Sequence, residues 1–509
     1  MAIKLIILAL FSVVTIFVGY YYRKWAQNVD DFLLGGRKVG LWISAFSYGA
    51  TYQSAVVFVG FAGQFGWRLG VSVLWVPIAV ALCGSYMPWM ILGRRTRLMT
   101  QHIKSATMPE FFSARYMSTG LKLMAAFIIF IFMIPYTASL YNGLSRLFAM
   151  AFNIDFVYCI AAMAVITAIF VIWGGYFATV ANDFIQGCIM LVGIVAVNIV
   201  ALNFKGGLTE ALLSLARVTA DEGATAPGIF TSFFGPDPVT VLGIVVLTTF
   251  GTWGLPQMVA KFYSIKSEKK IAAGAVVSTA FAVVVAGGCY FLGMFGRLYA
   301  DVIQRRPDGS VIYDSIVPTM LSGFPDLIIA IVIVMVFAAS ISTLSSLVLV
   351  SSSTFTLDFL KGHVIKKMDD KKQLLIIRSL ILAFIFASSL IAIYQYRGGL
   401  AFIAQFMSIS WGGMAGSFFA PLLYGLYWKR VSKASVWCCF IFSTGLMFAH
   451  FLFGQSFPGI LKSSINTGAL ALLAGCVIVP VVSLLTKAPD KAVVENCFSC
   501  LNENVSTKG

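Results

Sequence analysis

Charged side chains are scarce in this sequence of 509 residues. Lys, Arg, Asp and Glu together make up 11% of it, whereas soluble domains carry about 25%. Hydrophobic residues account for 59%. This composition excludes an ordinary water-soluble domain and indicates a protein whose outer surface lies in lipid.

Histidine clusters, phosphate loops and paired acids are also missing. The three histidines, His102, His363 and His450, are far apart, and no GxxxxGK[ST] phosphate loop occurs. No two acids, and no acid and histidine, share the middle of a hydrophobic run, as an intramembrane hydrolase would need. We therefore expect neither an enzyme nor an organic cofactor, and any transport must be driven by an ion gradient.

The nine cysteines do not form a metal-binding pattern. Most lie inside hydrophobic runs and are interpreted as small core residues. Cys497 and Cys500 form a single CxxC pair in the hydrophilic stretch 487–509, and one pair without a second is weak support for zinc. We interpret this stretch as a solvated, reduced cytoplasmic tail.

Hydrophobic runs long enough to span a bilayer recur from Ile3 to Leu485. They are continuous rather than short and alternating, which excludes a β-barrel. The sequence predicts an all-α polytopic membrane protein with about thirteen transmembrane helices, forming one transporter domain over 1–486. The predicted spans are 3–22, 41–65, 70–92, 121–147, 157–176, 177–203, 239–260, 271–296, 326–352, 374–394, 399–427, 434–453 and 467–486.

The distribution of charge predicts the orientation. A net charge of +16 could suggest a nucleic-acid partner, but the basic residues concentrate in alternate loops and acids such as Glu210, Asp237 and Asp314 occupy the opposite side. This asymmetry is the positive-inside rule. It predicts a multi-pass protein of the cell membrane with its N-terminus outside, a cytoplasmic C-terminal tail and no nucleic-acid partner. The basic residues assigned to the cytoplasm include Arg37, Lys38, Arg94, Arg95, Arg97, Lys261, Lys266, Lys361, Lys429 and Arg430.

Two predicted spans are interrupted near their middle. Ser47–Ser54 in the second span and Thr248–Gln257 in the seventh combine Gly, Pro and polar residues that tolerate unwound backbone. The interruptions lie five spans apart, and an odd offset inverts the second copy across the membrane. Such a pair predicts a transporter built from inverted repeats, about 41–203 and 239–427. The alternative is that both are ordinary kinks.

Asp183 is an acid within an otherwise uncharged hydrophobic run. A carboxylate at membrane depth costs about 2.5–3.5 kcal/mol even on insertion scales, so it needs a partner or a function. A second run, 339–346, carries hydroxyls at helical spacing. Carboxylate and hydroxyl oxygens suit a small hard cation. The alternatives are a structural acid hydrogen-bonded at a helix end, and hydroxyls that only pack helices.

These oxygens predict two sodium sites. Unwound backbone exposes carbonyls, so those of Ala50 and Gln53 are expected to face Ala339, Ser342 and Thr343 in a first site. A second site is expected deeper in the protein. Its residues are Asp183, Ser345 and Ser346.

Several motifs together give the chain a resemblance to a known family. It resembles the sodium/solute symporters, which include proline, pantothenate, sialic acid and sugar symporters, from Asp31–Arg37 through Tyr424–Trp428. The resemblance implies a LeuT-like inverted repeat of five plus five helices, with one helix before and two after. The stretches that carry it are Ala50-Thr51-Tyr52-Gln53-Ser54-Ala55, Ser113-Ala114-Arg115-Tyr116, Gly174-Gly175-Tyr176 with Asn182-Asp183, and the serine run 339–346.

The resemblance also implies site assignments. Ala50, Gln53, Ala339, Ser342 and Thr343 match the family's general sodium site. The residues of the second site match an additional sodium site of the sialic acid branch. One departure is Tyr52, where the family's proline symporters carry an aspartate. The stretches around both interruptions look closest to the pantothenate and monocarboxylate branch.

The substrate pocket is expected beside the first sodium site. No Lys or Arg lies in the middle of the spans that would form it, so a substrate carboxylate would be held by helix ends, hydroxyls or sodium. Trp75 has an alternative interpretation as a lipid-facing or core residue. The candidate substrate residues are Ser54, Val57, Phe58, Trp75, Trp253, Gln257 and Ser410.

The predicted function is sodium-coupled import of a small organic solute by alternating access. A carboxylate-bearing solute such as pantothenate, a monocarboxylate or proline fits best. A sugar, sialic acid or polyol symporter is the alternative, followed by an ion channel, for which no filter segment is visible. The predicted partners are the solute, Na+ and the lipid bilayer; the sequence leaves the oligomeric state open, a monomer included.

Overall fold

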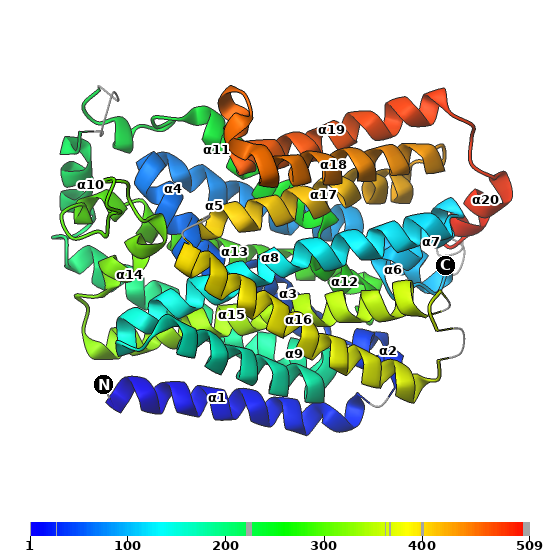
Figure 1. Ribbon diagram of the computed structural model, residues 1–509, viewed down its shortest axis with the longest axis horizontal. Coiled ribbons are helices and arrows are strands. Elements are labelled where there is room, and N and C mark those ends of the chain that lie inside the picture. Colours follow the sequence, from blue (N-terminus) through cyan, green and yellow to red (C-terminus); the bar gives the residue numbers. More distant parts are fainter. Residues whose placement is uncertain are drawn as a thin grey trace.

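The protein is a bundle of helices that lie roughly along one direction, horizontal in Figure 1. The computed structural model describes residues 2–26, 28–219, 226–361, 363–365, 368–398 and 402–501. Within these ranges only isolated β-bridges occur beside the helices. The all-α class predicted from the sequence is therefore confirmed.

Twenty α-helices make up the described part of the chain, and short tighter or wider turns join several of them. They are α1 (Ala2–Tyr22), α2 (Val29–Leu34), α3 (Leu41–Tyr52), α4 (Ala62–Leu69), α5 (Trp75–Ala79), α6 (Arg94–His102), α7 (Met108–Tyr116), α8 (Thr119–Phe152), α9 (Phe156–Asn203), α10 (Leu208–Arg217), α11 (Pro238–Thr249), α12 (Pro256–Tyr263), α13 (Ile271–Gly293), α14 (Ile316–Leu321), α15 (Asp326–Thr354), α16 (Asp370–Gly398), α17 (Ile403–Tyr427), α18 (Lys433–Phe453), α19 (Ser464–Leu485) and α20 (Lys491–Ser499).

Among the described residues, ten helical segments are long and apolar enough to cross a membrane, or up to eleven with a bent pair. Two of the ten, Val56–His102 and α9, have 47 and 48 residues. A straight helix of that length would measure about 70 Å, more than twice the hydrocarbon core of a bilayer. Each contains a glycine with positive φ, Gly70 at 59° and Gly175 at 56°, where two predicted spans adjoin. The count of thirteen stays a prediction.

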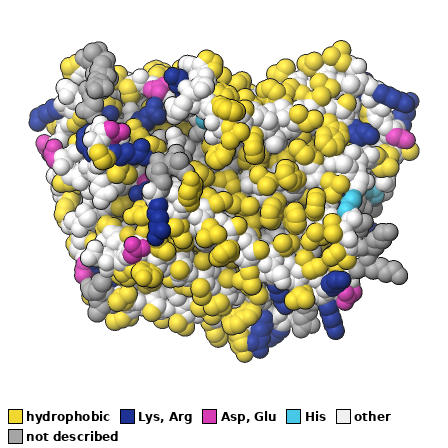
Figure 2. Space-filling model, in the orientation of Figure 1, with side chains coloured by type: hydrophobic (Ala, Val, Ile, Leu, Met, Phe, Trp, Pro, Cys, Tyr) yellow, Lys and Arg dark blue, Asp and Glu magenta, His cyan; other side chains and the backbone are white. Residues whose placement is uncertain are grey.

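The directions of the first and last long helices indicate an odd number of crossings. In Figure 1, α1 begins at the end of the bundle that carries α10 and α14, and α19 finishes at the opposite end, near α20. Figure 2 shows a broad hydrophobic band between these two ends, with charged side chains mainly toward the ends. This is the surface expected of a membrane-spanning bundle. Which end faces the cytoplasm stays a prediction.

Both predicted interruptions are present. α3 ends at Tyr52, Gln53 adopts an extended ψ of 119°, and a wide helical turn follows from Val56. In the second, α11 ends at Thr249 and α12 begins at Pro256 after a tight turn, with a bend of 44°. Proline suits the first helical position because its missing amide hydrogen would have no intrahelical partner. The exact repeat boundaries stay predictions.

The described part of the tail does not match the prediction of a solvated segment. α20 packs against the bundle, and Cys497, Phe498 and Cys500 are buried. The guanidinium of Arg115 lies 5.3 Å from the centre of the Phe498 ring, and the Lys429 ammonium lies 5.6 Å from it. Burial raises the pKa of the Cys497 thiol. The cysteine pair is part of an apolar helix face that covers this end of the bundle, so the solvated reading of these cysteines is wrong.

One close helix contact gives a test of the fold. A Cβ atom on Gly293, at the end of α13, would overlap the backbone carbonyl of Ala62 in α4. We expect Gly293→Ala to destabilise the protein by about 1–3 kcal/mol, because backbone cannot move aside as a side chain can. Thermal melting of the detergent-purified protein measures this. Gly287→Ala, in the same helix with nothing within 4 Å of its added Cβ, is the control and should melt no lower than the parent.

Candidate ion and substrate site

The first interruption leaves carbonyl groups that a hydroxyl pair approaches. Because α3 ends at Tyr52, the carbonyls of Ala50 and Thr51 in its last turn lack backbone donors from the following turn. The Ser342 hydroxyl donates to the carbonyl of Ala50 at 3.0 Å, and the Thr343 hydroxyl donates to that of Thr51 at 3.1 Å. Both hydroxyls also reach the Ala339 carbonyl, at 3.0 and 3.1 Å. Three carbonyl and two hydroxyl oxygens therefore gather between α3 and α15.

This oxygen cluster has the chemistry of a sodium site. The side chains of Ser342 and Thr343 are fully buried, and every ligand atom in the cluster is a neutral oxygen. A hard cation binds such oxygens when the hydroxyl lone pairs turn towards it. The structure brings together four of the five predicted residues and adds Thr51. The fifth is Gln53, whose backbone N–H donates to the Gly49 carbonyl at 3.1 Å. The assignment of the Gln53 carbonyl to the sodium site stays a prediction.

Asp183, predicted to hold a second sodium, already has a cationic partner. The Lys261 ammonium, on α12, lies 3.3 Å from Oδ2 of Asp183. It also donates to the hydroxyls of Ser47 and Ser346, at 2.7 and 3.2 Å. The Ser47 hydroxyl donates to the same carboxylate oxygen. All four side chains are buried, and each comes from a different helix.

This arrangement corrects the assignment of Lys261 to a cytoplasmic loop. The predicted span ended at 260, but α12 continues to Tyr263 and buries the lysine. The spacing of Gln257 and Lys261 could have indicated this, because residues four apart share one face of a helix. The Ser345 hydroxyl donates to the Ser342 carbonyl of its own helix at 3.1 Å, and the assignment of Ser345 to the second site stays a prediction.

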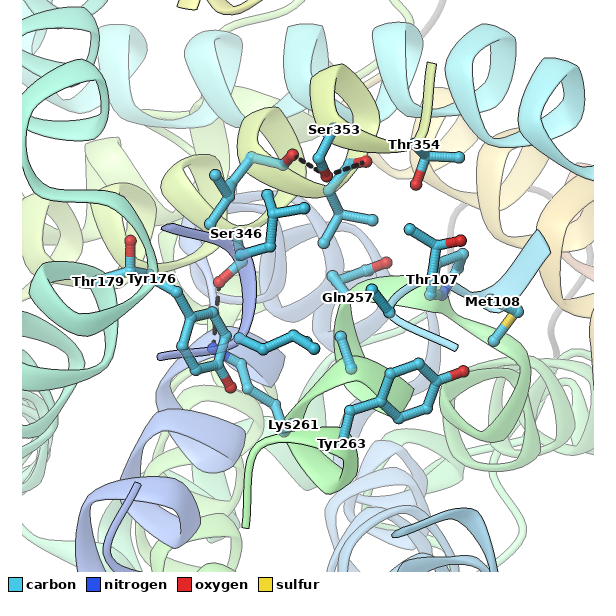
Figure 3. A pocket seen from close by; sticks show the side chains of 17 residues that line it. Thr107, Met108, Tyr176, Thr179, Gln257, Lys261, Tyr263, Ser346, Ser353 and Thr354 are labelled. Atoms are coloured by element: carbon cyan, nitrogen blue, oxygen red, sulfur yellow. Dashed lines mark hydrogen bonds between the residues drawn. The ribbon is translucent and has the colours of Figure 1, made fainter. Parts of the chain in front are cut away.

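Figure 3 shows the pocket that Lys261 lines. Lys261 is hydrogen-bonded there to Ser346, and the Tyr176 ring lies beside the ammonium. The side chains enclose a cavity of about 30 Å³, which is room for about one water molecule. Thr107 and Met108, at the start of α7, line its far side. The cavity therefore lies between the ion pair and the end of the bundle formed by α2 and α7.

An aromatic cluster joins the two interruptions. The ring of Tyr52 lies 6.3 Å from that of Trp411 in α17, and the ring of Tyr136 in α8 lies 6.0 Å from Trp411. The Tyr52 hydroxyl donates to the carbonyl of Thr248, just before the second interruption. A Cβ on Gly251 would meet Trp411 at 3.4 Å. Tyr136 and Trp411 were missed by sequence reasoning because aromatics are common in membrane spans.

Most of the predicted substrate residues lie in the protein interior. Ser54, Val57 and Phe58 are buried in and after the first interruption. In the described part of the chain, Oγ of Ser54 and Oε1 of Gln257 are buried without a hydrogen-bond partner. Such atoms are costly unless a ligand or water satisfies them. These four residues stay predicted substrate contacts.

The other three predicted substrate residues have partners within the protein. Trp253 donates its indole N–H to the Cys83 carbonyl at 2.8 Å, and Ser410 donates to the Phe406 carbonyl of its own helix at 2.8 Å. Trp75 is partly exposed. Its indole N–H donates to the Phe233 carbonyl at 3.1 Å and its ring packs 4.6 Å from the Phe233 ring. This places Trp75 against the segment that follows α10, so its assignment to the substrate pocket is wrong.

Near both ends of the bundle, charged side chains form ion pairs or hydrogen bonds with segments that are distant in the sequence. Arg146 lies 3.7 Å from the buried carboxylate of Asp314, which also accepts the amide of Ile403, at the start of α17. Burial raises the pKa of Asp314, and the charge of Arg146 opposes that shift. At the other end, Arg37 donates to the Ser105 carbonyl at 2.7 Å. Burial lowers the pKa of this guanidinium.

Comparisons with known proteins agree with this architecture. The chain is 27% identical over 500 residues to the osmoregulated proline transporter OpuE of Bacillus subtilis, covering 97% of each protein. It is 28% identical to a sodium/proline symporter of Staphylococcus aureus, covering 99% of this chain and 96% of the relative.

Solved structures show the same fold. A sodium-coupled sialic acid symporter in an outward-open state matches with a TM-score of 0.71 at 18% identity, over 96% of this chain and 98% of that one. The closed form of Mhp1, a nucleobase-cation-symport-1 family transporter, matches with a TM-score of 0.50 at 14% identity, over 91% and 97% of the two chains. The transporter fold implied by the sequence motifs is confirmed.

A family profile gives the assignment directly. The profile described as the sodium:solute symporter family matches residues 32–441, which include both interruptions, the oxygen cluster and the aromatic cluster. The resemblance stated from the motifs is therefore confirmed, and this chain belongs to the sodium:solute symporter family.

Proposed function

We propose that this protein imports a small carboxylate-bearing solute, with proline the first candidate, in symport with sodium. The observation that carries the proposal is the buried oxygen cluster between Ala50, Thr51, Ala339, Ser342 and Thr343. Family membership supports sodium as the coupling ion. The names of the relatives, a proline transporter and a sodium/proline symporter, support proline.

The position of the oxygen cluster explains how ion and solute binding become coupled. Its carbonyls belong to the end of α3 and its hydroxyls to α15, so a bound sodium ion joins two separate elements. Tyr52, the last residue of α3, belongs also to the aromatic cluster. An ion that fixes the end of α3 therefore orders one wall of the solute pocket. Each ligand then favours the conformation that binds the other.

The aromatic cluster and the unpartnered polar atoms suit a small amphipathic solute. The faces of Tyr52 and Trp411 accept an apolar ring, and the hydroxyl of Ser54 can donate to a carboxylate. The start of α12 also offers the positive end of its helix dipole. A substrate that combines a saturated ring with a carboxylate, as proline does, fits these groups.

Tyr52 supports a second candidate class. The family's proline symporters carry an aspartate at this position, whereas Tyr52 is uncharged and donates to Thr248. Without that negative charge, a solute no longer needs a positive amino group near α3. Pantothenate or another monocarboxylate is therefore the second candidate.

We place the protein in the cell membrane with α10 and α14 outside and α6, α7 and α20 at the cytoplasmic face. The excess of Lys and Arg at the second end and of acids at the first supports this orientation.

Uptake into proteoliposomes tests the proposed function. We expect saturable uptake of labelled proline that requires sodium and increases with an inside-negative potential, because each net charge moved gains about 2.3 kcal/mol per 100 mV. Unlabelled pantothenate, a monocarboxylate and a sugar are added as competitors to rank the substrate classes. Equal uptake with potassium, or with a proton gradient alone, would contradict sodium coupling.

Two hydroxyl deletions test the oxygen cluster. Ser342→Ala and Thr343→Ala each remove a neutral ligand, so the sodium concentration for half-maximal uptake should rise about tenfold, equivalent to about 1.4 kcal/mol. Ser340→Ala is the matched control, because Ser340 is buried in the same helix and donates only to the Val336 carbonyl of α15. If all three variants kept the parental sodium dependence at normal expression, the two hydroxyls would not be ligands.

Replacing Trp411 tests the solute pocket. Trp411→Leu should raise the half-saturating concentration of the transported solute between about twofold and tenfold, since a well-packed aromatic contact contributes about 0.5–1.5 kcal/mol beyond area burial. Trp173→Leu is the control, because this tryptophan of α9 is 44% exposed on the outer surface. An effect on sodium affinity alone, with solute affinity unchanged, would remove Trp411 from the pocket.

A further inference from the structure

We propose that the Lys261 ammonium permanently takes the place of a second coupling cation at Asp183, so that transport is coupled to one sodium ion. The inference rests on the proposed sodium symport and specifies its stoichiometry. It follows from the place of a built-in positive charge among the oxygens that a second sodium ion would need.

All three N–H donors of the Lys261 ammonium have hydrogen-bond acceptors. A lysine ammonium carries three N–H donors, and Lys261 has three oxygen partners, on Asp183, Ser47 and Ser346, at 3.3, 2.7 and 3.2 Å. The ring of Tyr176 covers a further side, with its centre 5.5 Å from the ammonium nitrogen. Each donor has an acceptor, and the charge of the ammonium is balanced by the carboxylate.

A second sodium ion does not fit this arrangement. It would have to share the oxygens of Asp183 and Ser346 with an ammonium already at contact distance, and two positive charges repel strongly where water is excluded. If the ion displaced Lys261, a buried ammonium would lose its counter-charge, which is more costly than leaving the pair intact. The predicted second sodium site is therefore occupied by the protein itself.

The oxygen cluster around Ser342 and Thr343 differs from the Asp183 site because it contains no charged side chain. It contains only neutral oxygens, so the positive charge there must come from a mobile ion. Thr51 connects the two places, because its carbonyl accepts from Thr343 and its hydroxyl oxygen lies 3.4 Å from that of Ser346. The protein thus holds one fixed cation and one place for a mobile cation on adjacent turns.

The fixed cation also accounts for how four helices meet. Ser47 belongs to α3, Asp183 to α9, Lys261 to α12 and Ser346 to α15. α3 precedes the first interruption and α12 follows the second. A transported ion at this place would join them only in the loaded state, whereas a tethered ammonium joins them also when no ion is bound.

Counting bound sodium ions on the purified full-length protein tests the inference. We expect equilibrium binding of radioactive sodium to saturate at one ion per chain, and the sodium Hill coefficient of uptake to be near one. Two ions per chain in the parent protein would overturn the inference and leave the proposed function intact. No bound sodium, with no sodium-dependent uptake, would overturn the proposed function itself.

Removal of the Lys261 ammonium should allow a second sodium ion to bind at Asp183. In Lys261→Ala, Asp183 keeps the hydroxyl of Ser47 and gains room, so the count should rise from one to two ions per chain. Lys261→Arg keeps a fixed positive charge and should stay at one. A folded Lys261→Ala protein, judged by its elution volume and melting curve, that still bound one ion would overturn the inference.

A charge-neutral double variant protects the test against misfolding. Asp183→Asn combined with Lys261→Gln removes both charges, so neither is left buried without a partner. It should bind one sodium ion per chain, because the carboxylate that would attract a second ion is gone. Two ions in this variant would show that the second place does not depend on Asp183, and the inference would fail.

Discussion

A polypeptide in a bilayer must satisfy its backbone polar groups internally, and this requirement shapes the centre of the protein. Where α3 ends at Tyr52, carbonyl groups lose their partners in a region without bulk water. The hydroxyls of Ser342 and Thr343 donate to the carbonyls of Ala50 and Thr51 and so satisfy them. The interruption of α3 is thereby joined to α15 by hydrogen bonds. In the proposed function, the same carbonyls are ligands of the sodium ion.

The second interruption depends on close backbone approach instead of hydroxyl groups. A Cβ on Gly254 would come within 2.7 Å of the Phe419 amide nitrogen, so only glycine allows the turn to lie against α17. A Cβ on Gly251 would meet the Trp411 ring at 3.4 Å, which is an ordinary van der Waals contact. The tight turn between α11 and α12 is therefore held against the helix that carries the aromatic cluster. This explains why the two interruptions lie side by side. Tyr52, at the first, is hydrogen-bonded to Thr248, at the second, although almost 200 residues separate the two in the sequence.

The sequence contained the signals for the helix interruptions and for most of the oxygen cluster between α3 and α15. Gly, Pro and polar residues in hydrophobic runs marked both breaks, and the Ala-x-x-Ser-Thr spacing marked Ala339, Ser342 and Thr343. Hydropathy could not place Lys261, because a lysine at the end of a hydrophobic run looks the same whether it reaches water or a buried acid. Only the position of Asp183 on a distant helix decides between them.

Trp75 and the cysteines of the tail also differ from the sequence-based predictions, because contacts distant in the sequence decide their surroundings. Trp75 and the cysteines of α20 were interpreted from local composition, but their surroundings are supplied by segments far away in the chain. Trp75 packs on Phe233, and Phe498 packs under Arg115. Local sequence predicts that a residue is apolar or can be helical. It does not predict which of several apolar surfaces the residue will cover.

A lysine tethered beside Asp183 limits how steeply the transporter can concentrate its solute. With one sodium ion carried per uncharged solute, a membrane potential of 100 mV contributes about a fiftyfold accumulation, and a tenfold sodium gradient contributes a further factor of about ten. With two mobile ions both factors would be squared. The fixed charge therefore lowers both the accumulation ratio that can be reached and the number of sodium ions that enter with each solute molecule.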